Sequence, residues 1–337
     1  MSETADTVLV TGISGYIAAY VAAKLVERGF RVRGTVRSLG KGQRILQALA
    51  AHGTDITNID LVEANLASDD GWKSAVAGCR YIQHIASPFP MEPPRDREAL
   101  VPEARAGAMR VIEQGLAAGA ERIVMTSSIV AMIGRPGRGE HVRITESDWS
   151  DPDWRPLTAY PVSKTRAERA AWDYVTAQDA KDRLVTVCPG LVLGPDPYDN
   201  GGASLGLIET IMKGEMPVVP RVAYPIVDVR DCAAIHVAAM TADGAGGRRL
   251  MAASETLWFK RIGEILRDAY PNRSKLPRAE LPDWLVRLAA HFDDRVKGVV
   301  PDLGTFHDAD AGYVTNLTQV KPRPVAGSIL EAAAVYA

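Results

Sequence analysis

A glycine-rich turn near the start of this 337-residue chain constrains its fold more than any other feature. Val8-Leu9-Val10 has the composition of a short β-strand, and residues 18–28 carry apolar side chains at helical spacing. The segment between them, Thr-Gly-Ile-Ser-Gly-Tyr-Ile-Ala at 11–18, has glycine where the turn is tight and where the backbone approaches a ligand. Unpaired N–H groups at the start of the helix would face phosphate groups. The turn predicts a dinucleotide-binding unit.

Strand and helix patterns alternate through the first half of the chain. Strands are expected at 31–37, 60–64, 81–86, 122–126 and 184–188, with helices at 43–52, 97–118 and 160–177. This order predicts an α/β fold, a doubly wound parallel sheet of the Rossmann type. We predict a dinucleotide-binding domain over 1–188, with segments near 226–252 returning to it. A smaller, mainly C-terminal lobe over 189–337 is expected to bind substrate.

The end of the second strand predicts which dinucleotide binds. An acidic residue there would bind a ribose 2′-hydroxyl and repel a 2′-phosphate, but this chain has Arg37. A guanidinium can hold a phosphate with two hydrogen bonds, and Lys41 follows closely. We therefore predict NADP(H) rather than NAD(H). The alternative is a solvated basic loop that only flanks the site.

A tyrosine and a lysine four residues apart predict acid–base chemistry. Tyr160 and Lys164 share one face of the expected helix, and Pro161 is tolerated in its first turn. A nearby ammonium stabilises a phenolate, so we expect Lys164 to lower the pKa of Tyr160. Tyr160 could then exchange a proton with a substrate oxygen near neutral pH.

These motifs resemble those of the extended short-chain dehydrogenase/reductase superfamily. The closest likeness is to its group of dihydroflavonol reductases, cinnamoyl-CoA reductases and microbial aldehyde or ketone reductases. Further segments agree in order along the chain: Thr-Val-Arg-Ser (35–38), Ile-Ala-Ser-Pro-Phe (85–89), Thr-Ser-Ser (126–128), Cys-Pro-Gly-Leu-Val-Leu-Gly-Pro (188–195) and Val-Asp-Val-Arg-Asp (227–231). The asparagine that many members carry on a central helix has no counterpart at 103–108.

The resemblance implies roles for individual residues. Ser128 would polarise the substrate oxygen, with Ser127 the second candidate; Tyr160 would be the acid or base, and Lys164 would also bind the nicotinamide ribose. The cofactor residues expected from the turn and the resemblance are Gly12, Ser14, Gly15, Tyr16, Ile17, Arg37, Lys41, Asn65, Leu66, Ala86, Ser87, Tyr160, Lys164, Pro189, Val192 and Ser204. We expect the substrate pocket to be shaped by Phe89, Met91 and Tyr224.

Charge and cysteine content argue against other classes of protein. A net charge of -2 gives no basic field for nucleic acid or for an anionic membrane. The three cysteines show no spacing typical of a metal site, and the polar N-terminus predicts a cytoplasmic protein. We expect an NADPH-dependent reductase of an aldehyde or ketone. The family resemblance also implies a homodimer that pairs through the helices at 97–118 and 160–177. The alternatives are a nucleotide-sugar epimerase or dehydratase, and a non-enzymatic NADP-binding regulator.

Overall fold

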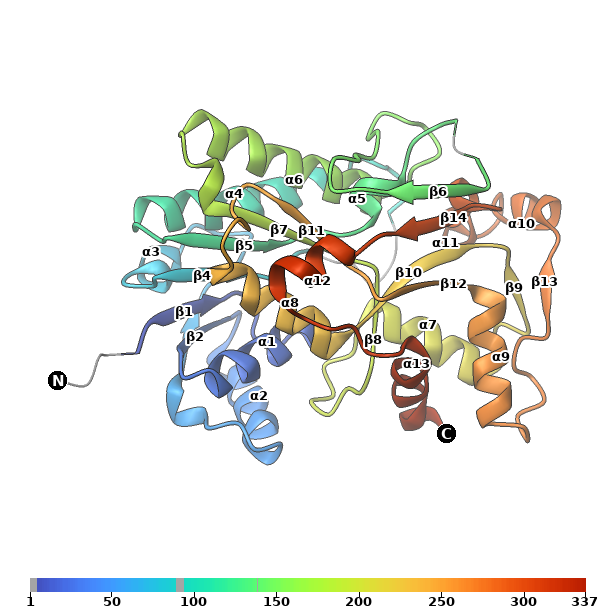
Figure 1. The fold of residues 1–337 in the computed structure, drawn as a ribbon, viewed down its shortest axis with the longest axis horizontal. Coiled ribbons are helices and arrows are strands. Elements are labelled where there is room, and N and C mark those ends of the chain that lie inside the picture. Colours follow the sequence, from blue (N-terminus) through green and yellow to red (C-terminus); the bar gives the residue numbers. More distant parts are fainter. Residues whose placement is uncertain (1–4, 89–93, 138) are drawn as a thin grey trace.

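A seven-stranded parallel sheet forms the centre of the molecule (Figure 1). The computed structural model describes residues 5–88, 94–137 and 139–337. The strands lie in the order β3-β2-β1-β4-β5-β7-β11, and every neighbouring pair is parallel. Their bounds are β1 (Thr7–Val10), β2 (Arg31–Val36), β3 (Ile59–Glu63), β4 (Tyr81–His84), β5 (Arg122–Thr126), β7 (Leu184–Pro189) and β11 (Arg249–Ala252).

The strand order reverses between β1 and β4, which confirms the predicted doubly wound fold. The chain moves outward from β1 to β2 and β3, then crosses back to β4 on the other side of β1. In open sheets of this kind, ligands bind beyond the carboxyl ends of the strands at this reversal. β11, which lies beyond residue 188, is the last strand on one edge.

Helices cover both faces of this sheet, and Figure 1 shows α4 and α6 on one side with α1 and α2 on the other. One apolar core includes residues of α1, α2 and α8, and a second includes residues of α3, α4 and α6. All six residues of β7 are buried, as expected for a strand covered on both faces. The helix bounds are α1 (Tyr16–Glu27), α2 (Leu39–Ala51), α8 (Val229–Thr241), α3 (Trp72–Val76), α4 (Val101–Ala117) and α6 (Ala159–Ala177).

A second sheet of five strands lies beside the first, in the right-hand half of Figure 1. It contains β6 (His141–Ile144), β8 (Leu191–Leu193), β10 (Ala223–Asp228), β12 (Glu255–Trp258) and β14 (Phe306–Ala309), while β9 (Val218–Pro220) pairs with β13 (Ala279–Leu281). The other helices are α5 (Val130–Ile133), α7 (Ala203–Met212), α9 (Phe259–Ala269), α10 (Asp283–Ala289), α11 (Asp294–Lys297), α12 (Gly312–Thr318) and α13 (Val325–Ala333). Short 3₁₀ helices span Ile56–Asn58, Lys181–Arg183, Val300–Asp302 and Ala334–Tyr336.

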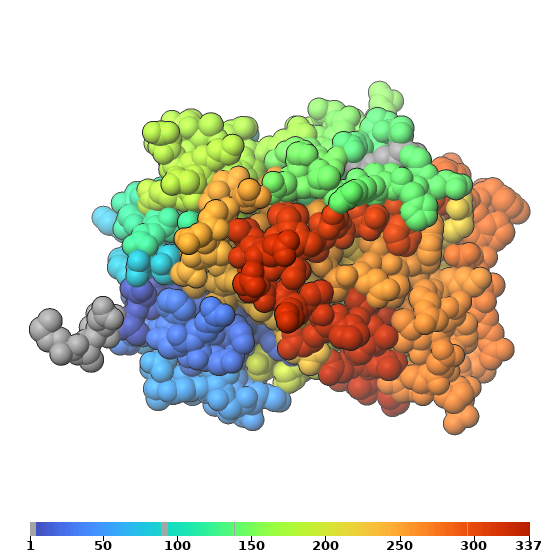
Figure 2. All heavy atoms as spheres, viewed as in Figure 1, coloured from blue at the N-terminus to red at the C-terminus, as the bar shows by residue number. Residues whose placement is uncertain are grey.

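The C-terminal third of the chain covers much of the surface shown in Figure 2, where its atoms are orange and red. It is anchored to the first sheet through α8. Asp228 caps α8 by accepting from the N–H of Arg230 (2.8 Å), and the Ser328 hydroxyl of α13 donates to the same carboxylate (2.7 Å). No helix within the described ranges is long and apolar enough to cross a membrane.

One predicted helix begins later than the sequence indicated. A helix was expected from residue 97, but α4 begins at Val101. Asp96 explains the difference, because its carboxylate accepts a hydrogen bond from the backbone N–H of Glu98 (2.9 Å). Such a local turn competes with the first helical hydrogen bonds.

Candidate active site

The glycine-rich turn joins β1 to α1 and is held between two neighbouring strands. Gly12 has a φ of +62°, and a Cβ there would come within 2.9 Å of the Ala86 Cβ, so glycine is required. The Gly12 N–H donates to the Thr35 hydroxyl (2.9 Å). The Thr11 hydroxyl oxygen accepts from the N–H groups of Ile85 (2.9 Å) and Ala86 (3.0 Å). The turn is therefore fixed before any ligand binds.

A cavity of about 640 Å³ extends from this turn along the carboxyl ends of the central strands. It brings together most of the residues that the sequence singled out. Those that line it are Gly12, Ser14, Gly15, Tyr16, Ile17, Arg37, Asn65, Leu66, Ala86, Ser87, Ser127, Ser128, Tyr160, Lys164, Pro189, Val192 and Ser204. One cavity is thus lined by the glycine-rich turn, by Arg37 and by the Tyr160–Lys164 pair.

Two predicted residues lie elsewhere in the structure. Lys41 is exposed on α2 and is not among the residues that line the cavity. Tyr224, on β10, is also outside the lining; its hydroxyl donates to Asp302 (2.5 Å) and its ring stacks on His307. Phe89 and Met91 lie outside the described residues.

Other lining residues were not named as site residues from the sequence, although several belong to the motif segments. Trp72 closes one wall, and its indole N–H donates to the backbone oxygens of Asn65 (2.9 Å) and Ser68 (3.1 Å). Thr35 could have been found, since it immediately precedes Val36-Arg37, whereas no motif in the sequence indicated the residues at 200–203. The additional lining residues are Ala18, Thr35, Val36, Ala64, Trp72, Ile85, Pro88, Glu103, Thr126, Gly190, Asn200, Gly201, Gly202 and Ala203.

Tyr160 and Lys164 meet the cavity from the first turns of α6, as their spacing predicted. Burial is the main influence on the pKa of Tyr160 and raises it, while a hydrogen bond with Ser128 lowers it. The net effect in the cofactor-free protein is a raised pKa of Tyr160, because desolvation of the phenol outweighs the effects that lower it. Burial also lowers the pKa of Lys164 to about 8, against the raising effect of Glu168. The Lys164 ammonium donates to the Thr126 backbone oxygen (3.4 Å).

The two serines after β5 have different partners. The Ser127 hydroxyl donates to the buried carboxylate of Glu168 (2.5 Å), behind the cavity. Ser128 makes the hydrogen bond with Tyr160 that lowers the phenol pKa. The Ser128 hydroxyl therefore interacts with the Tyr160 side chain, whereas the Ser127 hydroxyl ties the end of β5 to Glu168 on α6.

The cavity fits a dinucleotide with a 2′-phosphate. Arg37 lines it where β2 ends and has an exposed side chain, so a guanidinium is available to an anion. Gly12 leaves room for close approach beside Ala86. The Tyr16 hydroxyl, at the start of α1, is buried with no hydrogen-bond partner among the described residues. Lys164, Pro189 and Val192 line the same cavity.

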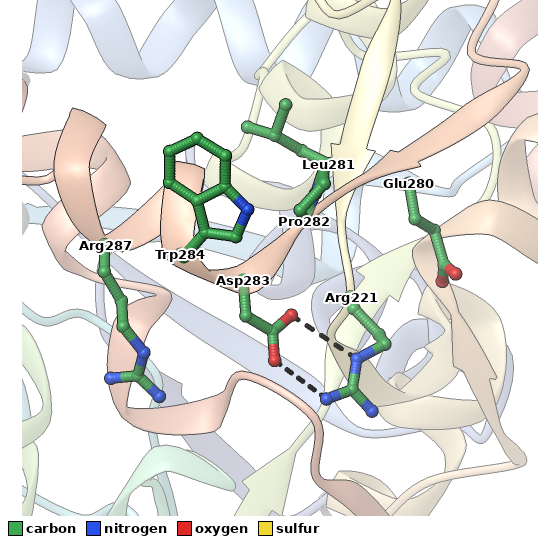
Figure 3. Close-up of a pocket in the computed structure, with 7 residues that line it drawn as sticks. All are labelled: Arg221, Glu280, Leu281, Pro282, Asp283, Trp284 and Arg287. Atoms are coloured by element: carbon green, nitrogen blue, oxygen red, sulfur yellow. Dashed lines mark hydrogen bonds and ion pairs between the residues drawn. The ribbon is translucent and has the colours of Figure 1, made fainter.

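A second hollow of about 630 Å³ lies in the C-terminal part of the chain (Figure 3). Arg221 and Asp283 form an ion pair on its floor, with Nη2 and Oδ2 2.8 Å apart. Its lining residues are Arg221, Glu280, Leu281, Pro282, Asp283, Trp284 and Arg287. None of the predicted site residues is among them, so this hollow is separate from the candidate active site.

Comparisons with known proteins indicate the family to which the chain belongs. The model of the family described as "NAD dependent epimerase/dehydratase family" matches residues 8–252. Cinnamoyl-CoA reductase 1 of Arabidopsis thaliana is 36% identical over 255 residues, which cover 75% of this chain and 72% of that protein. Ketoreductase azaE of Aspergillus niger is 29% identical over 315 residues, covering 87% and 91%.

Solved structures share the fold over almost the whole chain. The crystal structure of Gre2 from Candida albicans, solved in complex with NADPH, superposes with a TM-score of 0.78. It is 24% identical, and the match covers 98% of this chain and 99% of that one. These comparisons confirm the predicted resemblance: the chain belongs to the NAD-dependent epimerase/dehydratase family, in the extended branch of the short-chain dehydrogenases/reductases.

Proposed function

We propose that the protein reduces an aldehyde or ketone to an alcohol with NADPH. The observation that carries the proposal is one cavity lined by Arg37 at the end of β2, by Ser128 just after β5, and by Tyr160 and Lys164 on α6. Relatives in the same family include cinnamoyl-CoA reductases and a ketoreductase. An epimerase of the same fold would use NAD, which has no 2′-phosphate for Arg37 to bind.

The residues of the chain supply proton transfer and orientation. NADPH, when bound, supplies the hydride that the carbonyl carbon receives. Ser128 and Tyr160 would donate hydrogen bonds to the carbonyl oxygen, and Tyr160 would then give up its proton. Burial keeps the pKa of Tyr160 raised, so the phenol holds its proton at neutral pH until the reaction needs it. The ammonium of Lys164 stabilises the phenolate that remains.

The direct experiment follows NADPH oxidation against a panel of aromatic and aliphatic carbonyls. Turnover with any member, dependent on Tyr160, supports the proposal. Conversion of a nucleotide sugar without net oxidation of cofactor would favour the epimerase. Tight NADPH binding with no turnover of either kind would favour a regulator.

Arg37 is expected to set the cofactor preference. We expect the unmodified protein to bind NADPH at least about tenfold more tightly than NADH, since one charge-assisted contact contributes about 1.4 kcal/mol. Arg37→Asp should abolish or invert this preference by repelling the 2′-phosphate. Dissociation constants from cofactor fluorescence measure it, with Arg44→Asp, exposed on α2 and outside the cavity lining, as the matched control. Equal constants in the unmodified protein would exclude the role.

We also propose a homodimer that pairs through α4 and α6. The two helices pack against each other, and Ala106 is exposed on α4. Sedimentation at micromolar concentration is expected to give a dimer, and Ala106→Glu to shift it toward monomer. Ala51→Glu, on the exposed end of α2, is the control. A monomeric unmodified protein would contradict the proposal.

The division into two domains and the cytoplasmic location stay predictions.

A further inference from the structure

A fully buried carboxylate lies on α6 one helical turn beyond Lys164. Glu168 accepts hydrogen bonds from hydroxyls on two strands: Ser127, just after β5 (2.5 Å), and Thr186, on β7 (2.7 Å). The indole N–H of Trp172 also donates to it (3.3 Å). Such a group is costly to bury, so it needs compensating partners.

The compensating cation is Arg249, on β11. Its guanidinium donates to both oxygens of Glu168, with Nε–Oε1 at 2.7 Å and Nη2–Oε2 at 3.1 Å. It also donates to the backbone oxygens of Glu146 (3.2 Å) and Asp148, in the segment that leads from β6 towards α6. The guanidinium carbon lies 3.6 Å from the centre of the Trp149 ring. Arg249 therefore holds both α6 and the segment that precedes it.

The pair lies directly behind the residues that the reaction needs. Ser127 is the chain neighbour of Ser128, and Glu168 shares the helix face of Lys164. Through Ser127, the carboxylate connects the end of β5 to α6. This fixes the distance between the hydroxyl of Ser128 and the groups of Tyr160 and Lys164, which lie on different elements.

The charge of Glu168 also acts on Lys164. Burial lowers the pKa of Lys164, and the negative charge of Glu168 is the largest influence that raises it. Cys188 of β7 and His84 of β4 also interact with the ammonium. Burial raises the pKa of Cys188 to about 12 and lowers that of His84 to about 3, so both are neutral near pH 7. Among these groups, Glu168 is the one that carries charge at neutral pH.

From these contacts we infer that Glu168 and Arg249 are positioning residues for the reductase reaction: they hold Ser128 and Lys164 in register and keep Lys164 protonated. The inference rests on the proposed function, because the groups positioned are those that would act on the carbonyl. Neither residue touches the substrate, since neither lines the cavity.

The first test removes one hydroxyl at a time from the carboxylate. Ser127→Ala breaks the connection to β5 beside Ser128, whereas Thr186→Val breaks an equivalent buried bond on β7. We expect Ser127→Ala to lower kcat about tenfold, in line with one hydrogen bond to a charged group, with an unchanged Kd for NADPH. Thr186→Val should cost similar thermal stability and leave kcat within about twofold. Equal losses of kcat in the two variants would show that Glu168 and Arg249 only support packing and do not position the reacting groups.

The second test removes both charges together. Glu168→Gln combined with Arg249→Met leaves no unpaired buried ion, so the variant is expected to fold. Without the carboxylate, Lys164 lacks the largest influence that raises its pKa, so the alkaline limb of kcat/KM should move to lower pH. A purely structural loss would lower the rate by the same factor at every pH. An unmoved limb would overturn the electrostatic part of the inference.

A binding measurement separates failure of this inference from failure of the proposed function. If the unmodified protein reduces no carbonyl, the proposed function fails, but NADPH binding still reports on Lys164. We expect binding to weaken as the pH rises past the pKa of Lys164, and the midpoint to lie lower in the double variant. Identical midpoints in both proteins would overturn the inference.

Discussion

Tyr160→Phe is expected to lower kcat by about 10²–10⁴-fold, the range typical of losing a general acid. The substitution removes one oxygen from a partly buried ring, so the fold and the Kd for NADPH should change little. The raised pKa of Tyr160 makes the phenol a proton donor across the neutral range, and phenylalanine has no proton to give. Steady-state NADPH oxidation with the best carbonyl of the panel measures the loss.

A matched control lies on the same helix. Tyr174 is also partly buried on α6 and does not line the cavity, so Tyr174→Phe should retain full kcat. Ser128→Ala should lower turnover without changing NADPH affinity, because its partner is the substrate oxygen. If Tyr160→Phe keeps more than half of its activity, Tyr160 is not the acid, and a packing role at the start of α6 would replace it.

Lys164→Met is expected to damage two steps at once. The phenolate of Tyr160 loses its stabilising cation, and the ribose loses a hydrogen-bond donor. We therefore expect kcat to fall by about 10²-fold or more, and NADPH binding to weaken as well, unlike in Tyr160→Phe. Lys213→Met, on the exposed end of α7, is the control and should change neither quantity. Unchanged NADPH affinity in Lys164→Met would contradict the proposed ribose contact.

The stability of Lys164→Met should show that the fall in kcat comes from lost chemistry and not from unfolding. The pKa of Lys164 falls from 10.5 to about 8 on folding, so the folded state binds fewer protons between these values. Its burial therefore destabilises the protein below about pH 8, and this cost is relieved as the pH rises toward 10.5. Methionine removes the cost. Unfolding should show no loss of stability at pH 7 and a smaller gain on raising the pH than in the unmodified protein.

Local patterns predicted the sheet, the glycine-rich turn and the Tyr160–Lys164 pair. Each depends on residues close in sequence: the tight turn on Gly12, the shared helix face on a spacing of four. The predicted start of α4 was wrong because the Asp96 carboxylate accepts a hydrogen bond from the Glu98 N–H and forms a local turn there. The net rise in the pKa of Tyr160 could not be predicted, because desolvation depends on everything packed around the ring, which no local pattern contains.

The contacts behind the site could not be predicted in the same way. Glu168 and Arg249 are 81 residues apart, and nothing near either residue indicates its partner. The hydrogen bond from the Gly12 N–H to the Thr35 hydroxyl likewise joins the glycine-rich turn to β2, and nothing near either residue in the sequence indicates this pairing. The partners of polar side chains that are distant in sequence are determined by the folded sheet, and the local periodicity of the sequence does not predict them.

β11 comes late in the chain, and its position affects both folding during synthesis and the design of chimaeric proteins. A nascent chain that has emerged only as far as β7 has Glu168 but lacks Arg249, the cation that compensates its charge. We therefore expect the first 188 residues not to fold stably on their own, because residues 249–252 form the edge strand of the sheet. A chimaera that exchanges the substrate-binding part must therefore bring in a matching β11, with an arginine at its first position.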